Sequence, residues 1–432
     1  MPKRLDIADT DFEAQFLEVL GAKREADVDV NEAVAAILKD VAKRGDAAVV
    51  EYTNRFDRQN IAAADMAFTA DDLAEAERKI EPDLLDALKL AAERIETFHE
   101  RQLPDMEDYT DDDGVRLGYR WTAVEAAGLY VPGGLAAYPS SVLMNAIPAH
   151  VAGVERLVMV VPTPDGVINP LVLAAAKIAG VTEVYCIGGA QAVGALAYGT
   201  ETIKAVDKIV GPGNAYVAAA KRQVFGTVGI DMIAGPSEIL VVADGENDPS
   251  WIAADLLSQA EHDSVAQSIL ITDDKAFATR VEEAVESHLK TLDREEIARA
   301  SWSDYGVVIT VDDLMRQGVG LVDRIAPEHL ELAVENPDAL SHQIRNAGAI
   351  FLGRYTPEAI GDYVAGPNHV LPTSRTARFS SGLGVLDFMK RTTFVGCDAE
   401  SLNKIGPAAV KLADAEGLQA HGLSVSIRLN RG

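Results

Sequence analysis

The stretches Glu238-Ile-Leu-Val-Val242 and Ser268-Ile-Leu-Ile-Thr272 decide the fold of this chain. Each is a short run of mostly apolar residues that lacks the in-out alternation of a half-exposed strand. Such runs are typical of strands buried on both faces, which occur in parallel sheets covered by helices. Four further runs share the pattern: Leu157–Val161, Glu183–Ile187, Asp207–Val210 and Gly306–Thr310. Because these runs alternate with helical patterns from about residue 121, the sequence predicts an α/β fold.

The first quarter of the chain has a helical pattern instead. Phe12, Phe16 and Leu20 recur at helical spacing, and so do the apolar residues between Val34 and Val41, up to Gly45. The pattern changes again near residues 236 and 382. We therefore expect four segments: a helical part at 1–120, a second part at 121–235, a third at 236–381 and a C-terminal tail at 382–432.

The composition narrows the classes of partner. The chain has 432 residues and a net charge of −28, which argues against nucleic acid or an anionic membrane as partner. No apolar run reaches the ~18 residues of a membrane span. Two cysteines, Cys186 and Cys397, are too few for a disulfide framework or a thiolate metal site. The sequence predicts a cytoplasmic protein.

Four separated residues have the side chains of a metal site. Gln259 and His262 lie three residues apart and share one face of a predicted helix. Asp362 and His421 would complete a set of oxygen and nitrogen ligands that suits zinc. Each histidine could equally be a packed or solvated side chain, and glutamine is an unusual ligand.

Pro327-Glu328-His329 places a carboxylate beside an imidazole, at what we expect to be the start of a helix. An imidazole that titrates near neutrality suits general base catalysis, and a neighbouring carboxylate can activate water. The alternative is a first-turn carboxylate next to a surface histidine. Cys186 lies in an apolar run without a basic neighbour, so we expect a core residue and not a nucleophile.

The signals for a dinucleotide are weak taken alone. No Gly-x-Gly-x-x-Gly follows a predicted strand. Gly188-Gly-Ala-Gln191 and Gly211-Pro-Gly-Asn214 are two strand-to-helix turns in which glycine permits close backbone approach and an amide could meet a phosphate or ribose. Both could also be ordinary tight turns.

Several of these motifs together resemble the histidinol dehydrogenase family. The resemblance rests on the stretches Ile230–Ile239, Ala253–His262, Arg324–Leu330, Ala365–His369 and Ala420–Gly422, with Gly211–Asn214. They run in the expected order from about residue 30 to the end. The resemblance implies a four-electron oxidation of L-histidinol through L-histidinal to L-histidine, the last steps of histidine biosynthesis, with reduction of two NAD at a zinc site.

The resemblance also implies roles for individual residues. Glu328 and His329 would be catalytic, and one zinc per subunit would be bound by Gln259, His262, Asp362 and His421. Contacts to NAD fall on Tyr130, Gln191 and Asn214. Contacts to the substrate fall on Ser237, Gln259, His262, His329, Asp362, Glu416 and His421.

The implied architecture is two Rossmann-like lobes. The segment 121–235 would be the NAD-binding lobe, inserted between 1–120 and 236–381, and the tail 382–432 would cross to a partner in a domain-swapped homodimer with shared active sites. Three other functions stay open: oxidation of another primary alcohol, such as a sulfonated diol, by a member of the same family; a zinc hydrolase; and a silent ligand-binding homologue.

Overall fold

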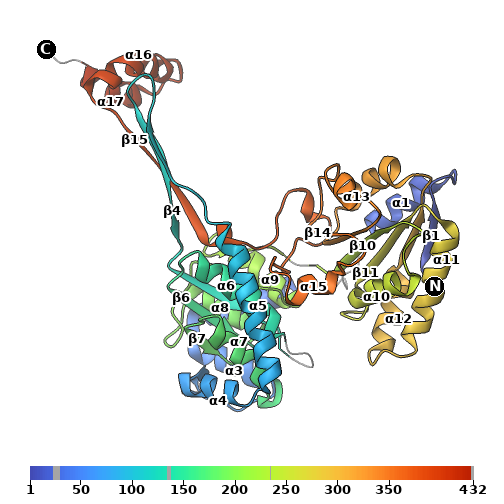
Figure 1. Ribbon diagram of the computed structural model, residues 1–432. Helices are drawn as coiled ribbons and strands as arrows, with labels where there is room; N and C mark the ends of the chain where they lie inside the picture. Colours follow the sequence, from blue (N-terminus) through green and yellow to red (C-terminus); the bar gives the residue numbers. More distant parts are fainter. Residues whose placement is uncertain (23–29, 134–137, 234, 430–432) are drawn as a thin grey trace.

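Two helix-covered sheets and a protruding arm make up the computed structural model (Figure 1), which describes residues 1–22, 30–133, 138–233 and 235–429. Ala234, within the motif 230–239, lies outside these residues. The predicted α/β fold with parallel sheets is confirmed. All six predicted strands are present, with bounds that differ by one or two residues.

The first sheet is parallel in every strand pair, and most of its strands come from the third segment, residues 236–381. Its order is β1 (Lys3–Asp6), β12 (Val307–Thr310), β11 (Gln267–Thr272), β10 (Glu238–Ala243), β13 (His329–Ala333) and β14 (Ala349–Leu352). One face packs against α1 (Phe12–Gly21), α13 (Val319–Ile325) and α14 (Pro337–Ser341). The other packs against α10 (Pro249–Ala260), α11 (Lys275–Leu289) and α12 (Glu295–Tyr305).

The second sheet has one antiparallel edge. Its order is β2 (Ala67–Phe68), β7 (Glu183–Tyr185), β6 (Arg156–Val160), β5 (Ala126–Tyr130), β8 (Lys208–Val210) and β9 (Gly229–Ile230), and only β2 runs against its neighbour. Helices α4 (Ala70–Arg78), α5 (Pro82–Glu100), α6 (Pro139–Val151) and α7 (Pro170–Ile178) cover one face. Helices α2 (Asn31–Arg44), α3 (Asp46–Phe56), α8 (Gly189–Tyr198) and α9 (Ala215–Val224) cover the other.

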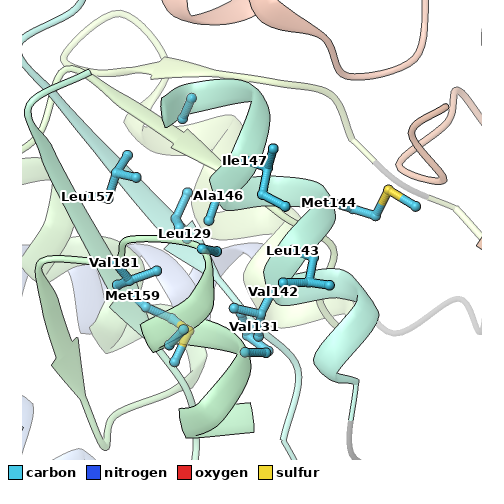
Figure 2. Close-up of a cluster of buried hydrophobic side chains, with 14 of the residues drawn as sticks. Leu129, Val131, Val142, Leu143, Met144, Ala146, Ile147, Leu157, Met159 and Val181 are labelled. Carbon is cyan, nitrogen blue, oxygen red and sulfur yellow. The ribbon is translucent and has the colours of Figure 1, made fainter. Parts of the chain in front are cut away.

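The core between α6 and the second sheet shows why these strands are continuous apolar runs. In Figure 2, Val142, Leu143 and Ile147 of α6 lie over Leu129 and Leu157 of the sheet. Every residue of β5 is buried. A strand covered on both faces has no solvent side on which polar residues could alternate.

Two features differ from the prediction. First, the segment 1–120 does not belong to one lobe: β1 and α1 join the first sheet, whereas α2 to α5 pack on the second, because the apolar stripe of α2 meets α8. Second, residues 329–333 form the strand β13 and not a helix. Leu, Glu and Ala favour helices, but pairing with β10 and β14 overrides that local preference.

The arm is a three-stranded antiparallel ribbon of β3 (Glu107–Thr110), β4 (Arg116–Ala123) and β15 (Met389–Gly396). It leads to a hairpin of α16 (Ala399–Ala415) and α17 (Gln419–Leu429), which stands clear of both sheets (Figure 1). The helix α15 (Glu358–Tyr363) lies between the two sheets. None of the described helices is long and apolar enough to cross a membrane.

Candidate active site

A cavity of about 440 Å³ lies between the two sheets, within the usual size of a small-molecule site. The first sheet contributes residues at the amino ends of β10 and β13. The carboxyl end of α10 and the helix α15 also contribute residues at this edge. The second sheet contributes the turns after the carboxyl ends of β5 and β8. The polar lining of the cavity includes Asn214, Lys221, Asp231, Ser237, Gln259, His262, Glu328, His329, Asp362 and His369, and Gly211 lines it through the backbone.

His329 is a deeply buried polar side chain of the cavity, with 4% of its surface exposed. Its Nδ1 lies 3.0 Å from the Glu238 carbonyl oxygen and 3.0 Å from Nε2 of Gln259. The Glu238 carbonyl oxygen can only accept, so a hydrogen bond to it needs a proton on Nδ1; the Gln259 N–H then cannot donate to Nδ1 as well, and Nε2 keeps a free lone pair. Burial lowers the pKa of His329, which favours the neutral ring. This tautomer suits a general base acting through Nε2.

Two carboxylates face Nε2 of His329. Glu358 Oε1 lies 3.5 Å away and Asp362 Oδ1 lies 4.0 Å away, and the three side chains form a group that could hold a metal ion. Burial, with the nearby charge of Glu358, raises the pKa of Asp362 to about 6, against the opposing effect of His369 and His329. Burial also raises the pKa of Glu358. A bound cation would stabilise the charged form of both.

Three buried polar atoms in this group lack a hydrogen-bond partner among the described residues: Gln259 Oε1, His329 Nε2 and Glu358 Oε1. Buried polar atoms in folded proteins are almost always satisfied, so such a cluster indicates a ligand. Oxygen and imidazole nitrogen donors are the ligands that zinc accepts. The residues present therefore fit a divalent ion of this kind.

Glu328 precedes β13 and is also buried. Its Oε2 accepts a hydrogen bond of 2.8 Å from the Glu238 backbone N–H, and it lies 3.7 Å from Nδ1 of His329. Burial, and then the neighbouring charge of Glu238, raises the pKa of Glu328 well above its ordinary value. A pKa raised in this way is typical of carboxyl groups at functional sites.

The other predicted ligands and substrate contacts are divided between the cavity and the arm. Ser237, Gln259, His262 and Asp362 line the cavity. Gln259 is buried in α10, and His262 follows the end of that helix. Glu416 and His421 are exposed on the α16–α17 hairpin and do not line the cavity of their own chain (Figure 1).

The predicted dinucleotide contacts gather at the carboxyl edge of the second sheet. Asn214 lines the cavity and caps α9, accepting from the backbone N–H groups of Tyr216 and Val217. Tyr130 and Gln191 are buried behind it; the Tyr130 hydroxyl accepts from Gly189 N at 3.0 Å, and burial raises the pKa of Tyr130 to about 12. Both glycine turns connect a strand to a helix, as the sequence predicted.

Cys186 is buried, as predicted, and burial raises the pKa of its thiol, so it is not an activated nucleophile.

Sequence reasoning missed Glu358 as a member of the site. The signal was available: Glu358 begins a short helix after Pro357, and Asp362 lies four residues later on the same face. His369, which the sequence analysis named only within the stretch Ala365–His369, also lines the cavity. His369 Nδ1 lies 3.1 Å from the Asp362 carbonyl oxygen, and its Nε2 lies 3.4 Å from the Ser141 hydroxyl.

Comparisons with known proteins identify the family of the chain. The family model described as histidinol dehydrogenase matches residues 21–429. The histidinol dehydrogenase of Rhodospirillum rubrum is 72% identical over the whole of both chains, and that of Ruegeria pomeroyi is 64% identical over 100% of this chain and 99% of its own.

A solved structure resembles the whole fold. The crystal structure of histidinol dehydrogenase from Elizabethkingia anophelis superposes with a TM-score of 0.94 at 36% identity, covering 99% of this chain and 98% of the other. The match spans both sheets and the arm. The chain belongs to the histidinol dehydrogenase family of oxidoreductases.

Proposed function

We propose that this enzyme oxidises L-histidinol through L-histidinal to L-histidine, with two hydride transfers to NAD and consumption of one water. The observation that carries the proposal is that one cavity joins the Gly211–Asn214 turn to the group of His329, Glu358 and Asp362. A dinucleotide held at the turn would present its nicotinamide to a substrate held at the group.

The first step is loss of a hydride from the primary alcohol, which requires a base for the hydroxyl proton. His329 takes that proton on Nε2, while its Nδ1–H continues to donate to the Glu238 carbonyl oxygen. The contact fixes both the tautomer and the plane of the ring. A base in this position is expected to contribute ~10²–10⁴-fold.

The second step requires hydration of the aldehyde before another hydride can leave. Glu328 removes a proton from the attacking water, and the backbone N–H of Glu238 orients its carboxylate. As the water adds, His329 returns the proton taken from the alcohol to the aldehyde oxygen and becomes a free base again. His329 then takes the hydroxyl proton of the hydrate as the second hydride leaves, and the protons on Glu328 and His329 pass to solvent. The product is a carboxylate, and both steps use the same hydride acceptor site.

We further propose one zinc per subunit, held by Gln259, His262 and Asp362 of one chain and His421 of a partner. When bound, the zinc would supply Lewis acidity and a fixed point for the substrate oxygen. Support comes from the unsatisfied oxygen of Gln259 and the raised pKa of Asp362. Ser237 and His329 of the cavity, with Glu416 of the partner, would complete the substrate contacts.

The proposal includes a homodimer and a cytoplasmic location. Two of the proposed site residues, Glu416 and His421, stand on an exposed hairpin that its own chain keeps away from the cavity. A second copy whose hairpin reached the cavity would complete it. Tyr130, Gln191 and Asn214 are the proposed contacts to NAD.

The test is the yield of NADH per L-histidinol with purified protein, together with identification of the product. We expect two NADH and L-histidine, and no activity after chelation until zinc is restored. One NADH with L-histidinal as the sole product would contradict the four-electron reaction. Turnover of a sulfonated diol with none of histidinol would assign the chain to another alcohol, and hydrolysis without NAD would contradict both.

A further inference from the structure

A buried ion pair at the other end of the cavity has no part in the proposed chemistry. Lys221 of α9 pairs with Asp231, the residue after β9, and their side chains are 3% and 1% exposed. Both residues line the cavity. Charges this deeply buried are unfavourable unless each is fully engaged.

The pair makes hydrogen bonds with both backbone polar groups of Gly211. Lys221 Nζ donates to the Gly211 carbonyl oxygen at 2.9 Å, and the Gly211 N–H donates to Asp231 Oδ2 at 2.8 Å. Gly211 opens the turn that ends at Asn214. The ion pair therefore fixes the backbone of that turn from two sides.

The backbone of Gly211 is itself special. Its φ is +110°, and an added Cβ would lie 2.1 Å from the Tyr130 carbonyl oxygen. The turn thus lies directly on the end of β5 in a conformation that other residues rarely adopt. Asn214 holds its far end by capping α9.

The cavity offers an anion little free positive charge. Among the described residues that line it, Lys221 is the only lysine or arginine, and Asp231 neutralises it. The phosphates of a dinucleotide would then depend on backbone N–H groups and amides, whose strength as ligands depends on position. Small displacements of the turn would weaken them.

We infer that the Lys221–Asp231 ion pair is a positioning device for the dinucleotide: it holds the Gly211–Asn214 turn in its binding conformation before the cofactor arrives. The inference rests on the proposed function, which places NAD at this turn. An ion pair of this kind is often replaceable by apolar residues without loss of stability, so its distinctive contribution here is the fixed position of Gly211.

The test is the double variant Lys221→Met/Asp231→Asn. Removing both charges together avoids leaving one buried charge unpaired, and asparagine can still accept from the Gly211 N–H. The dissociation constant of NADH, measured by fluorescence titration, should rise about tenfold or more, because the Gly211 carbonyl oxygen is no longer held by Lys221. KM for NAD should rise in parallel, while kcat at saturating NAD and KM for L-histidinol change little.

The matched control is Arg156→Met/Glu183→Gln. That pair also bridges neighbouring parts of the second sheet and donates to backbone carbonyl oxygens, but it does not line the cavity. We expect NADH binding within about twofold of wild type for the control. Thermal unfolding of both variants shows whether each keeps its fold.

A second measurement uses the wild-type protein, so that it does not depend on the variant folding. Amide hydrogen exchange at Gly211, whose N–H is bonded to Asp231, should be slow without NADH and change little when NADH binds. Fast exchange that NADH suppresses would overturn the inference, because the cofactor would then order the turn. Unchanged NADH affinity in a folded double variant, or an equal loss in the control, would also overturn it.

These outcomes separate the inference from the proposed function. Wild-type protein that binds NADH but does not oxidise L-histidinol would contradict the proposed function and leave the NADH titration of the variants valid. Wild-type protein that does not bind NADH would contradict both.

Discussion

The two sheets meet the cavity with opposite edges. The second sheet presents the carboxyl ends of β5 and β8, where ligands usually bind in parallel α/β sheets. The first sheet presents the amino ends of β10 and β13, with His329 as the first residue of its strand. We call the part of the cavity formed by the second sheet the dinucleotide side, and it consists of glycine turns and their backbone. We call the part formed by the first sheet the chemical side, and it consists of side chains of α10, β13 and α15.

The electrostatics of the two sides differ in the same way. The chemical side concentrates buried carboxyl groups with raised pKa values, among them Glu328, Glu331, Glu358 and Asp362. The dinucleotide side has one neutralised ion pair. The residues of the chemical side could hold a cation, whereas the charges of the dinucleotide side already balance each other, so binding there depends on geometry.

The largest expected effect lies on the chemical side. His329→Asn should reduce kcat for both L-histidinol and added L-histidinal by ~10²–10⁴-fold, because one base serves both hydride steps. Rates at saturating NAD, with zinc content measured in each variant, check this. A loss below about tenfold with zinc retained would remove His329 as the base.

Glu328→Gln should slow the two oxidation steps to different extents. If Glu328 activates water, the variant should lose more in the oxidation of L-histidinal than in that of L-histidinol, with a difference of ~10²-fold. The same assays with both substrates provide the measurement. Equal losses would mean that the carboxylate only orients His329, and because the two residues are adjacent their effects need not multiply.

Behind the site, Asp255 of α10 is hydrogen-bonded to Glu331, and burial raises the pKa of Asp255 to about 6, from 3.8. Between about pH 4 and 6 the unfolded state releases a proton that the folded state retains, so this carboxyl destabilises the fold as pH rises. Asp255→Asn should gain stability relative to wild type across that window, by up to about 3 kcal/mol.

Urea unfolding at pH 4, 5, 6 and 7 measures this gain. The exposed Asp9→Asn is the control for removal of a carboxylate from the surface. A gain in stability for Asp255→Asn that did not grow with pH would show that folding does not raise the pKa of Asp255.

Glu358→Gln tests a residue outside the proposed ligand set. It keeps the size of the side chain but removes the charge that faces His329 and Asp362, so zinc affinity should fall ~10–100-fold. Competition with a fluorescent chelator measures the affinity. Glu261→Gln, on the adjacent turn at the end of α10, is the control. Unchanged zinc affinity would limit Glu358 to packing.

The smallest effect concerns the arm. His329→Asn and His421→Asn should each be inactive, but refolding them together should restore about a quarter of the sites if His421 serves the partner's cavity. In each mixed dimer one site then has both defects and the other has none. No recovery, with mixed dimers shown by mass spectrometry, would place His421 in its own chain's site or outside any site.

The sequence determined the strands of the sheets and the two glycine turns by itself, because burial on both faces and positive φ leave local marks in composition. It also yielded Gln259 and His262 as residues close in space, since a spacing of three is local, although His262 lies past the end of α10. It misassigned residues 329–333, where helix-favouring residues occupy a strand held by β10 and β14.

Only the tertiary structure decided which residues face one another. Glu358 lies beside His329, and Lys221 and Asp231 hydrogen-bond to Gly211. Both arrangements depend on strand register and on the packing of distant segments. So does the split of residues 1–120 between the two sheets. Local propensity carries no record of such contacts, because their free energy arises only when the chain has folded and water has left the space between them.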